Sequence, residues 1–311
     1  MAFDHARRYW ALGPWQVNAT FGIDGGVGRL AYACVMHSID PAHLDLAALD
    51  LPADAHKGTR GGVGIMGGAG GMLGAAWLAG RAALHAGAGR VYVGQLDPAA
   101  PAVDPLYPEL MLRRADSVLG LPQVDAVVVG PGLGTGGMAP QLLSAAICTD
   151  RPLLLDADAL NLLATRADIA AGLAMRSAGT VLTPHPAEAA RLLAVTPQQV
   201  QSARAEVADT LQQRFNAVVV LKGAGTLVAW PGGMARNPTG SNRLATAGTG
   251  DVLSGLIGAL LARGLPPADA AQLGVWVHGR AGETLPDERP TASGLLPLVS
   301  GVLAALTRDT A

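Results

Sequence analysis

The stretch "LATAGTGDVLSGLIGALLARG", residues 244–264, places one carboxylate, Asp251, directly in front of a long apolar segment. Large apolar residues recur after it at helical spacing, and Gly264 is a suitable C-terminal stop. The pattern predicts a buried helix whose N-terminus attracts anions, because that end carries unpaired N–H groups and partial positive charge. Two interpretations of Asp251 stay open here. It caps the helix, as Asp often does, or the glycines of residues 248–250 let an anion approach the helix.

The rest of the chain alternates short β-branched runs with alanine- and leucine-rich stretches. Strands are expected at 63–66, 91–96, 125–130, 152–156, 180–183, 217–223 and 226–230, and helices at 74–86, 138–147, 158–164, 187–193 and 200–214. The last two strands are separated by only two residues, which predicts a hairpin. Unbroken apolar strands that alternate with helices are typical of a mostly parallel sheet covered on both faces. The predicted fold class is therefore α/β, with three αβα layers.

Composition and charge restrict the possible partners. Half of the 311 residues are hydrophobic, 15% are charged and the net charge is −2, so a large core is expected and disorder is excluded. No basic run is present, which argues against a nucleic-acid partner. Residues 61–80 are uncharged, but nine of them are glycines, which cost about 1 kcal/mol each inside a helix. A strand, a turn and a helix start are expected there instead of a membrane span. The first 15 residues lack a signal peptide's apolar region, so we expect a cytoplasmic protein.

Distinctive motifs follow five of the predicted strands, where functional residues of such sheets gather. They are "GGAGGMLGA" (67–75), "GPGLGTGG" (130–137), "DADALN" (156–161), "TPHPAE" (183–188) and "KGAGT" (222–226). The two glycine-rich turns predict two backbone surfaces that face one cleft. The first turn does not have strict G-x-G-x-x-G spacing, and Asp97, after the next strand, lies further along than the usual ~20 residues. A dinucleotide-binding turn is therefore only weakly indicated.

The polar residues of the other three motifs each have two interpretations. Asp156 and Asp158 are expected to serve helix entry, since Asp is a favoured capping residue, rather than to bind a metal. His185 lies between two prolines that restrict the backbone, and it is either a ligand-binding or a structural histidine. Lys222 ends a buried strand and must leave the core or meet an anion, which the adjoining glycines favour.

Six motifs occur in one order along the chain: "HKGTRGGVGIMGGAGGMLGAAWLAGRAALHAGAG" (56–89), "GPGLG" (130–134), "LDADALNLL" (155–163), "LTPHPAEAARLL" (182–193), "VVLKGAGTLVA" (219–229) and "NPTGSNRLATAGTGDVLSGLIGALLARG" (237–264). From about His56 to Glu283, the chain resembles the ADP/ATP-dependent NAD(P)H-hydrate dehydratases of the ribokinase-like superfamily. The resemblance implies a substrate that is NADH or NADPH with a hydroxyl added to the dihydronicotinamide ring. Phosphoryl transfer to that hydroxyl makes a good leaving group, which the ring nitrogen then expels.

The resemblance also implies roles for individual residues. Asp251 takes the proton from the hydroxyl as a general base, and the amides of Gly248, Thr249 and Gly250 stabilise the transferring phosphoryl group. The nucleotide-binding residues are Lys222, Gly223, Ala224, Gly225 and Thr226, together with Gly250. The residues that line the hydrate site are Ala75, Gly132, Gly134, His185 and Asp251. The Mg²⁺ ligands are Glu188 and Asn237.

The chain is expected to consist of one catalytic domain and a short preceding segment. Residues 1–55 are expected to form an N-terminal extension or connector, and residues 56–311 the dehydratase domain, without the epimerase domain that the family commonly carries. ADP is favoured over ATP as the co-substrate, and a homotetramer is expected. A vitamin or sugar kinase of the same superfamily remains the nearest alternative. A non-catalytic nucleotide-binding protein is a further one, although it need not keep a carboxylate at position 251.

Overall fold

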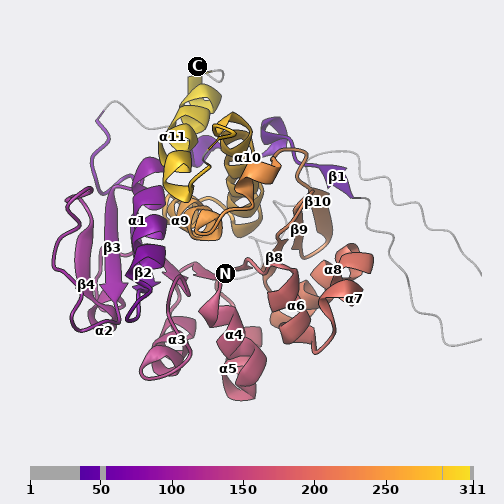
Figure 1. The fold of residues 1–311 in the computed structure, drawn as a ribbon, viewed down its shortest axis with the longest axis horizontal. Coiled ribbons are helices and arrows are strands. Elements are labelled where there is room, and N and C mark those ends of the chain that lie inside the picture. The colour runs from indigo at the N-terminus through magenta and orange to yellow at the C-terminus, as the bar shows by residue number, and fades with distance from the viewer. Residues whose placement is uncertain (1–35, 50–53, 289, 309–311) are drawn as a thin grey trace, which may run out of the picture.

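A sheet of ten strands runs through the computed structural model, which describes residues 36–49, 54–288 and 290–308 (Figure 1). Its strands, in spatial order, are β1 (His37–Ser38), β10 (Gly233–Arg236), β9 (Leu227–Trp230), β8 (Val218–Leu221), β7 (Thr180–Leu182), β6 (Leu153–Leu155), β5 (Ala126–Val129), β2 (Gly62–Gly67), β3 (Arg90–Gln95) and β4 (Met111–Arg114). The pairs from β8 to β4 are all parallel, whereas β9 is antiparallel to both of its neighbours. The mostly parallel sheet and the hairpin of β8 and β9 are confirmed.

Two layers of helices cover the sheet, one on each face (Figure 1). One layer contains α1 (Leu73–His85), α9 (Thr249–Ala262), α10 (Pro267–Thr284) and α11 (Ala292–Arg308). The other contains α2 (Ala115–Val118), α3 (Ala139–Ile147), α4 (Asp158–Thr165), α5 (Ala167–Ala174), α6 (Pro186–Leu193), α7 (Pro197–Ser202) and α8 (Arg204–Phe215). Alternate strand residues pack against opposite layers, as Ala126 and Val128 do against the first layer and Val127 and Val129 against the second. The predicted three-layer α/β class is confirmed.

The predicted strands all form, and the strands that were not predicted, β1, β4 and β10, lack a clear apolar pattern. Strand β4 is "MLRR" at the edge of the sheet, where only one side chain needs to be buried. Strand β10 contains a glycine and an exposed arginine. The single helix expected at 200–214 is two helices, α7 and α8, which meet at Ala203.

The chain before residue 56 contributes to the core where it is described. Strand β1 pairs in parallel with β10, and the side chains of Ile39 and Leu49 are buried in the same core as α9. A short 3₁₀ helix spans Ala47–Leu49 within the stretch expected to be an extended connector. Residues 1–35 and 50–53 lie outside the described residues, so the boundary at residue 55 stays a prediction.

Helix α9 lies unusually close to its neighbours because of two glycines. A Cβ atom at Gly255 would lie 1.9 Å from the carbonyl oxygen of Ala79 in α1, and one at Gly258 would lie 2.4 Å from the Val128 side chain in β5. The glycines therefore permit the close approach that holds α9 against α1 and the sheet. Among the described residues, no helix combines the length and the apolar character that crossing a bilayer requires.

Candidate active site

The N-terminus of α9 carries Asp251 as the third residue of the helix. The N-cap is Gly248, with φ at +89°, and no side chain in the described ranges caps this end, so the capping interpretation of Asp251 is wrong. The Thr249 amide donates to the Thr246 carbonyl oxygen at 3.4 Å. Within the described part of the chain, the amides of Gly250 and Asp251 have no acceptor. This first turn therefore retains N–H groups for an anion.

Lys222 lies against this turn and is held by buried carboxylates. Its Nζ donates to Oδ1 of Asp156 at 2.8 Å and lies 3.8 Å from Oε2 of Glu188. A Cβ atom at Gly250 would lie 3.5 Å from the same Nζ, so only a small residue leaves this space open. The hydroxyl of Ser254 donates to the other oxygen of Asp156 at 2.7 Å. The ammonium group, two carboxylates and the helix N-terminus thus form one charged centre.

Asp158 begins α4, as expected of a helix-entry residue, but the expected capping role of Asp156 and Asp158 is wrong. Among the side chains that the structure describes, none caps α4, whose N-cap is Ala157 with an unusual φ of +49°. Instead, Asp156 binds Lys222 and Ser254, and Asp158 accepts the Gly134 amide N–H at 2.8 Å. Their position after a central strand was the available sequence signal, because side chains that follow parallel strands converge at one edge of the sheet.

The two glycine-rich turns meet as predicted. The Ala69 amide donates to the Gly132 carbonyl oxygen at 2.7 Å, and the Gly68 amide to that of Pro131 at 3.1 Å. Gly132 has φ at +60°, and a Cβ atom there would lie 3.2 Å from the Cβ of Ala75 in α1. Three of the residues predicted to line the hydrate site, Ala75, Gly132 and Gly134, are therefore brought together beside α4.

His185 caps α6, so it has a structural role. Its Nδ1 accepts the amide N–H groups of Ala187 at 3.0 Å and Glu188 at 3.3 Å, and Glu188 accepts the His185 N–H in return. Burial lowers the pKa of the imidazole, and the Lys222 and Arg191 cations lower it further. The His185 side chain remains 45% exposed, so solvent reaches the ring, although its Nε2 lies 3.3 Å from Oε1 of Glu188. The capping role is compatible with a contact between His185 and substrate, which stays a prediction.

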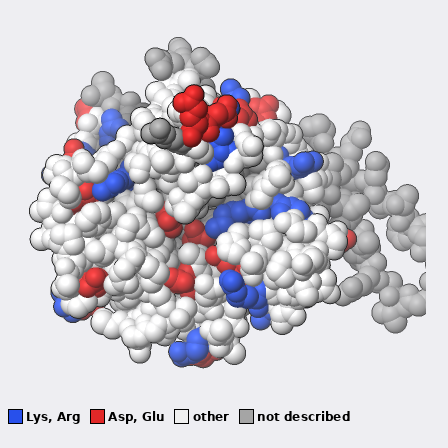
Figure 2. All heavy atoms as spheres, viewed as in Figure 1, with Lys and Arg blue, Asp and Glu red and all other residues white. Residues whose placement is uncertain are grey.

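The predicted nucleotide segment, residues 222–226, joins β8 to β9 and is flanked by two arginines. Positive φ angles occur at Gly223 (+137°) and Gly225 (+61°). A Cβ atom at these positions would lie 2.8 Å from the Arg204 side chain and 2.4 Å from that of Arg236, respectively. The guanidinium of Arg204 also donates to the carbonyl oxygens of residues 221 and 222. The glycines therefore leave room for two cations beside the backbone, and basic and acidic side chains meet near the middle of the face drawn in Figure 2.

The charged centre raises the pKa of Asp251. Burial raises it to about 7, Asp156 and Asp158 add to the rise, and Lys222 opposes it. A carboxylate with a pKa near neutrality is suited to accept a proton from a substrate hydroxyl. Burial lowers the pKa of His278, in α10, to about 4, and its neutral Nε2–H donates to the Thr249 carbonyl oxygen at 2.9 Å. His278 thus helps to position the first turn of α9, a role with no local sequence signal.

The two predicted metal ligands already have partners. The amide of Asn237 donates to the Val275 carbonyl oxygen, and its oxygen accepts from the backbone and hydroxyl of Thr239. Glu188 accepts the His185 N–H and lies near Lys222. No contact among the described residues joins Glu188 to Asn237, nor do those residues contain a cluster of three metal-binding side chains. Both assignments stay predictions.

Comparison with known proteins gives this geometry a context. A protein-family profile described as NAD(P)H-hydrate dehydratase matches residues 63–301. The "ADP-dependent (S)-NAD(P)H-hydrate dehydratase" of Neisseria meningitidis serogroup B is 47% identical over 247 residues, which cover 78% of this chain and 83% of that protein. The "Bifunctional NAD(P)H-hydrate repair enzyme Nnr" of Escherichia coli (strain K12) is 43% identical over 236 residues, 74% of this chain. The chain spans only 44% of that bifunctional relative.

Solved structures agree with the sequence comparisons. The ADP/ATP-dependent NAD(P)H-hydrate dehydratase from Bacillus subtilis, co-crystallised with ATP/Mg²⁺, superposes with a TM-score of 0.73 at 32% identity, covering 90% of this chain and all of that one. A hydroxyethylthiazole kinase from Pyrococcus horikoshii OT3 superposes with a TM-score of 0.57 at 18% identity, which shows a shared fold alone. By its sequence profile and by its relatives, the chain belongs to the NAD(P)H-hydrate dehydratase family.

Proposed function

We propose that this protein is an ADP-dependent (S)-NAD(P)H-hydrate dehydratase, a hydro-lyase that repairs hydrated NADH and NADPH. The observation that carries the proposal is the position of Asp251, whose pKa is raised to about 7, beside unpaired amides and the Lys222 ammonium. This centre lies between the paired glycine turns, proposed to hold the hydrate, and residues 222–226, proposed to hold the nucleotide. The name of the Neisseria relative supports the same substrate and co-substrate.

The first step is phosphoryl transfer to the substrate hydroxyl. Asp251 removes the hydroxyl proton as the oxygen attacks the terminal phosphorus of ADP, and the bond from that phosphorus to AMP breaks. The amides of Gly248, Thr249 and Gly250 are proposed to stabilise the phosphoryl oxygens, with the Gly250 and Asp251 amides free to donate in this structure. The Lys222 ammonium is proposed to offset the negative charge of the ADP phosphates as they approach the buried carboxylates.

The second step is elimination of phosphate. The lone pair of the ring nitrogen drives cleavage of the bond between the ring carbon and the ester oxygen, which releases inorganic phosphate, and loss of a proton from the adjacent ring carbon to solvent restores the dihydronicotinamide double bond. The products are NADH or NADPH, inorganic phosphate and AMP. Ala75, Gly132, Gly134 and His185 are proposed to hold the ring during both steps, since small residues and a neutral imidazole leave space for a flat polar ligand.

Magnesium neutralises phosphate charge in phosphoryl transfer. Glu188 and Asn237 are the proposed metal ligands, and their oxygens already accept hydrogen bonds from the protein, which a bound metal would have to share. The cytoplasmic location and the homotetramer remain part of the proposal, on the reasoning that NADH, NADPH and ADP are cytoplasmic metabolites and that small residues suit close subunit packing.

The test of the proposed function is the return of 340 nm absorbance when purified protein is incubated with hydrated NADH. We expect recovery of the (S) hydrate with ADP and none without a nucleotide, with AMP and phosphate formed in equal amounts. ATP in place of ADP measures the choice of donor. If absorbance does not return with either nucleotide while a vitamin or sugar substrate is phosphorylated, the protein is a kinase of the same fold.

Replacement of His185 separates its capping role from its proposed contact with substrate. We expect His185→Ala to lower the free energy of unfolding by about 1 kcal/mol, the usual cost of losing an N-cap. His185→Asn restores a good cap and should restore the melting temperature. Both variants should raise the KM for hydrated NADH while ADP affinity is unchanged. If KM and melting temperature recover together in His185→Asn, the histidine serves only as a cap.

A further inference from the structure

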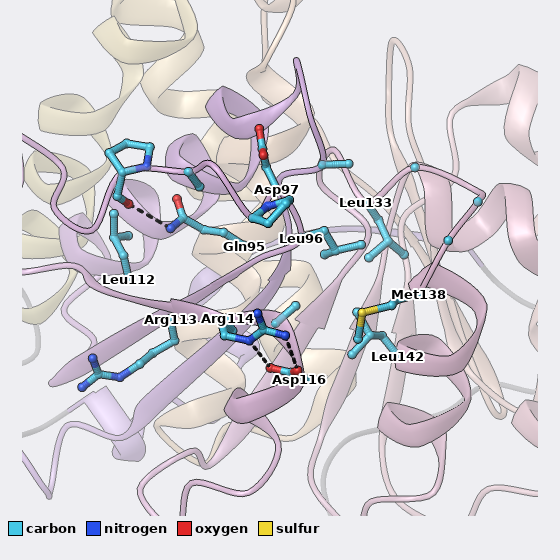
Figure 3. Close-up of a pocket in the computed structure, with 18 of the residues that line it drawn as sticks. Gln95, Leu96, Asp97, Leu112, Arg113, Arg114, Asp116, Leu133, Met138 and Leu142 are labelled. Carbon is cyan, nitrogen blue, oxygen red and sulfur yellow. Dashed lines mark hydrogen bonds and ion pairs between the residues drawn. The ribbon is translucent and has the colours of Figure 1, made fainter.

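A cavity of about 790 Å³ opens beside the active site, at the carboxyl ends of β2 to β5 (Figure 3). Its size is typical of small-molecule sites, which occupy about 300–1,000 Å³. It reaches the proposed hydrate site at Ala69 and Gly134, since both residues line the cavity. Apart from Gly134, its lining residues have no part in the mechanism above.

The position of the cavity in the sheet restricts what it can hold. The nucleotide segment follows β8, Asp156 follows β6, and the cavity lies beyond them, toward β3 and β4. Three strand spacings separate β6 from β3, or about 14 Å. The cavity therefore lies on the opposite side of the reacting centre from residues 222–226, the proposed nucleotide segment. A substrate that reacts at Asp251 and also fills the cavity must be long.

We propose that the cavity binds the adenosine half of the hydrated dinucleotide and that Asp97 favours the NADH hydrate over the NADPH hydrate. The proposal rests on the proposed function and adds to it a second half-site. The dinucleotide has the required form, because its pyrophosphate joins the reacting nicotinamide to a distant adenosine. The glycine turn at the start of α1 borders the cavity at Ala69, and glycine turns at helix N-termini bind pyrophosphate in dinucleotide-binding βαβ units.

Asp97 is placed to recognise the adenosine ribose. It follows β3, the second strand of the βαβ unit that begins with β2 and the glycine turn. Its Oδ1 accepts the Ala99 amide N–H at 2.9 Å, and in the described chain its Oδ2 has no hydrogen-bond partner. Oδ2 lies 3.7 Å from the position that a Cβ of Gly70 would take, so the carboxylate faces the glycine turn despite the long sequence separation. A carboxylate there accepts hydrogen bonds from ribose hydroxyls and repels a 2′-phosphate.

Two exposed arginines, Arg113 and Arg114, also line the cavity, so the expected preference for the NADH hydrate rests on the Asp97 carboxylate. Arg114 is paired with Asp116 at 2.9 Å, and Figure 3 shows Arg113 pointing away from both. Leu133, Met138 and Leu142 lie together across the cavity in the same view and form an apolar wall suited to an adenine ring.

The segment that carries Asp97 is held in place without a ligand. The Gln95 side chain accepts from the Trp77 indole at 2.8 Å and donates to the Pro101 carbonyl oxygen at 3.1 Å. Further on, the fully buried carboxylate of Asp104 accepts two hydrogen bonds from Arg81. Because these anchors lie in the protein itself, the half-site is already formed before substrate binds.

The test compares three hydrates as substrates: those of NADH, of NADPH and of reduced nicotinamide mononucleotide, which lacks the adenosine half. Recovery of 340 nm absorbance at saturating ADP gives kcat/KM for each. We expect wild-type protein to favour the NADH hydrate over the mononucleotide hydrate by at least about tenfold, the effect of one good charged hydrogen bond.

Two variants test the cavity and the carboxylate separately. Gly136 lines the cavity, has an ordinary φ, and a Cβ there meets nothing within 4 Å, so Gly136→Phe should fill the space without strain. It should lower kcat/KM for the dinucleotide hydrates about tenfold more than for the mononucleotide hydrate. Gly301→Phe, at an equally open position in α11, is the matched control and should behave as wild type. Asp97→Asn can keep the bond to Ala99 and should raise the NADPH-to-NADH hydrate preference about tenfold.

The outcomes separate this inference from the proposed function. Recovery of none of the three hydrates by the wild-type protein would contradict the function and, with it, the half-site. Equal use of mononucleotide and dinucleotide hydrates, with no selective effect of Gly136→Phe, would leave the function intact and overturn the half-site. An effect of Gly136→Phe together with an unchanged hydrate preference in Asp97→Asn would overturn the role of Asp97.

Discussion

Asp251→Asn is expected to yield a protein that is more stable than wild type and nearly inactive. Turnover of hydrated NADH should fall by at least ~10²-fold, the range for loss of a general base, because an amide cannot accept the hydroxyl proton. The fold should persist, since Asp251 is not the cap of α9 and no hydrogen bond among the described residues depends on its carboxylate. The measurement is kcat in a variant whose circular dichroism matches that of the wild type.

The gain in stability follows from the raised pKa of Asp251. Its pKa is 3.8 in the reference state and about 7 in the fold, so between these values the folded state binds the proton more tightly. The contribution of this group to stability is present below about pH 4 and is lost as pH rises through 7. Asp251→Asn should therefore raise the free energy of unfolding at pH 8 by about 1–4 kcal/mol, where the upper value converts the full shift and the lower allows for partial exposure.

The pH dependence provides the control for this prediction. The stability difference between Asp251→Asn and wild type should vanish near pH 4, and the kcat/KM of wild type should fall below about pH 7. An acidic limb near pH 4 in the wild-type profile would show that Asp251 is not buried as described. Near-normal turnover in a folded Asp251→Asn protein would assign the base to another residue.

Lys222→Ala is expected to destabilise the protein and to abolish tight ADP binding. Its ammonium is bonded to Asp156, 2% exposed, and lies near the buried carboxylate of Glu188. Removal leaves two buried carboxylates without a cation, which costs about 3–5 kcal/mol for a broken buried pair. In calorimetric titrations, ADP affinity should fall more than hydrate affinity, because the lysine is assigned to the phosphates.

The chain offers matched controls for Lys222→Ala. Lys57 is the other lysine of the sequence and is exposed, so Lys57→Ala should leave stability and ADP binding unchanged. The double variant Lys222→Ala/Asp156→Asn should recover part of the lost stability without recovering ADP affinity. Unchanged ADP affinity with a collapse of hydrate affinity would show that the nucleotide site and the hydrate site have been assigned the wrong way round.

Local pattern was sufficient to predict the α/β class and most of the elements. Continuous apolar runs such as 126–129 predict strands buried on both faces, because each side chain must be shielded from water whichever way it points. The helix after Asp251 was equally clear from its spacing. Edge strands such as β4 were missed, since a strand with one exposed face and charged residues resembles a loop. The motif residues at strand ends could be placed near one another for the same topological reason, although their partners could not.

Only the tertiary structure decided which side chains of the site form ion pairs and hydrogen bonds with one another. Asp156 lies 66 residues from Lys222 and 98 from Ser254, so nothing in its neighbourhood in the sequence distinguishes an ion pair from a helix cap. The raised pKa of Asp251 likewise depends on burial and on carboxylates contributed by another strand end. Asp97 lies beside Gly70 only because β2 and β3 are adjacent in the sheet. Spacing along the chain reports secondary structure, whereas charge, hydrogen bonding and cavity shape depend on which strands become neighbours when the sheet forms.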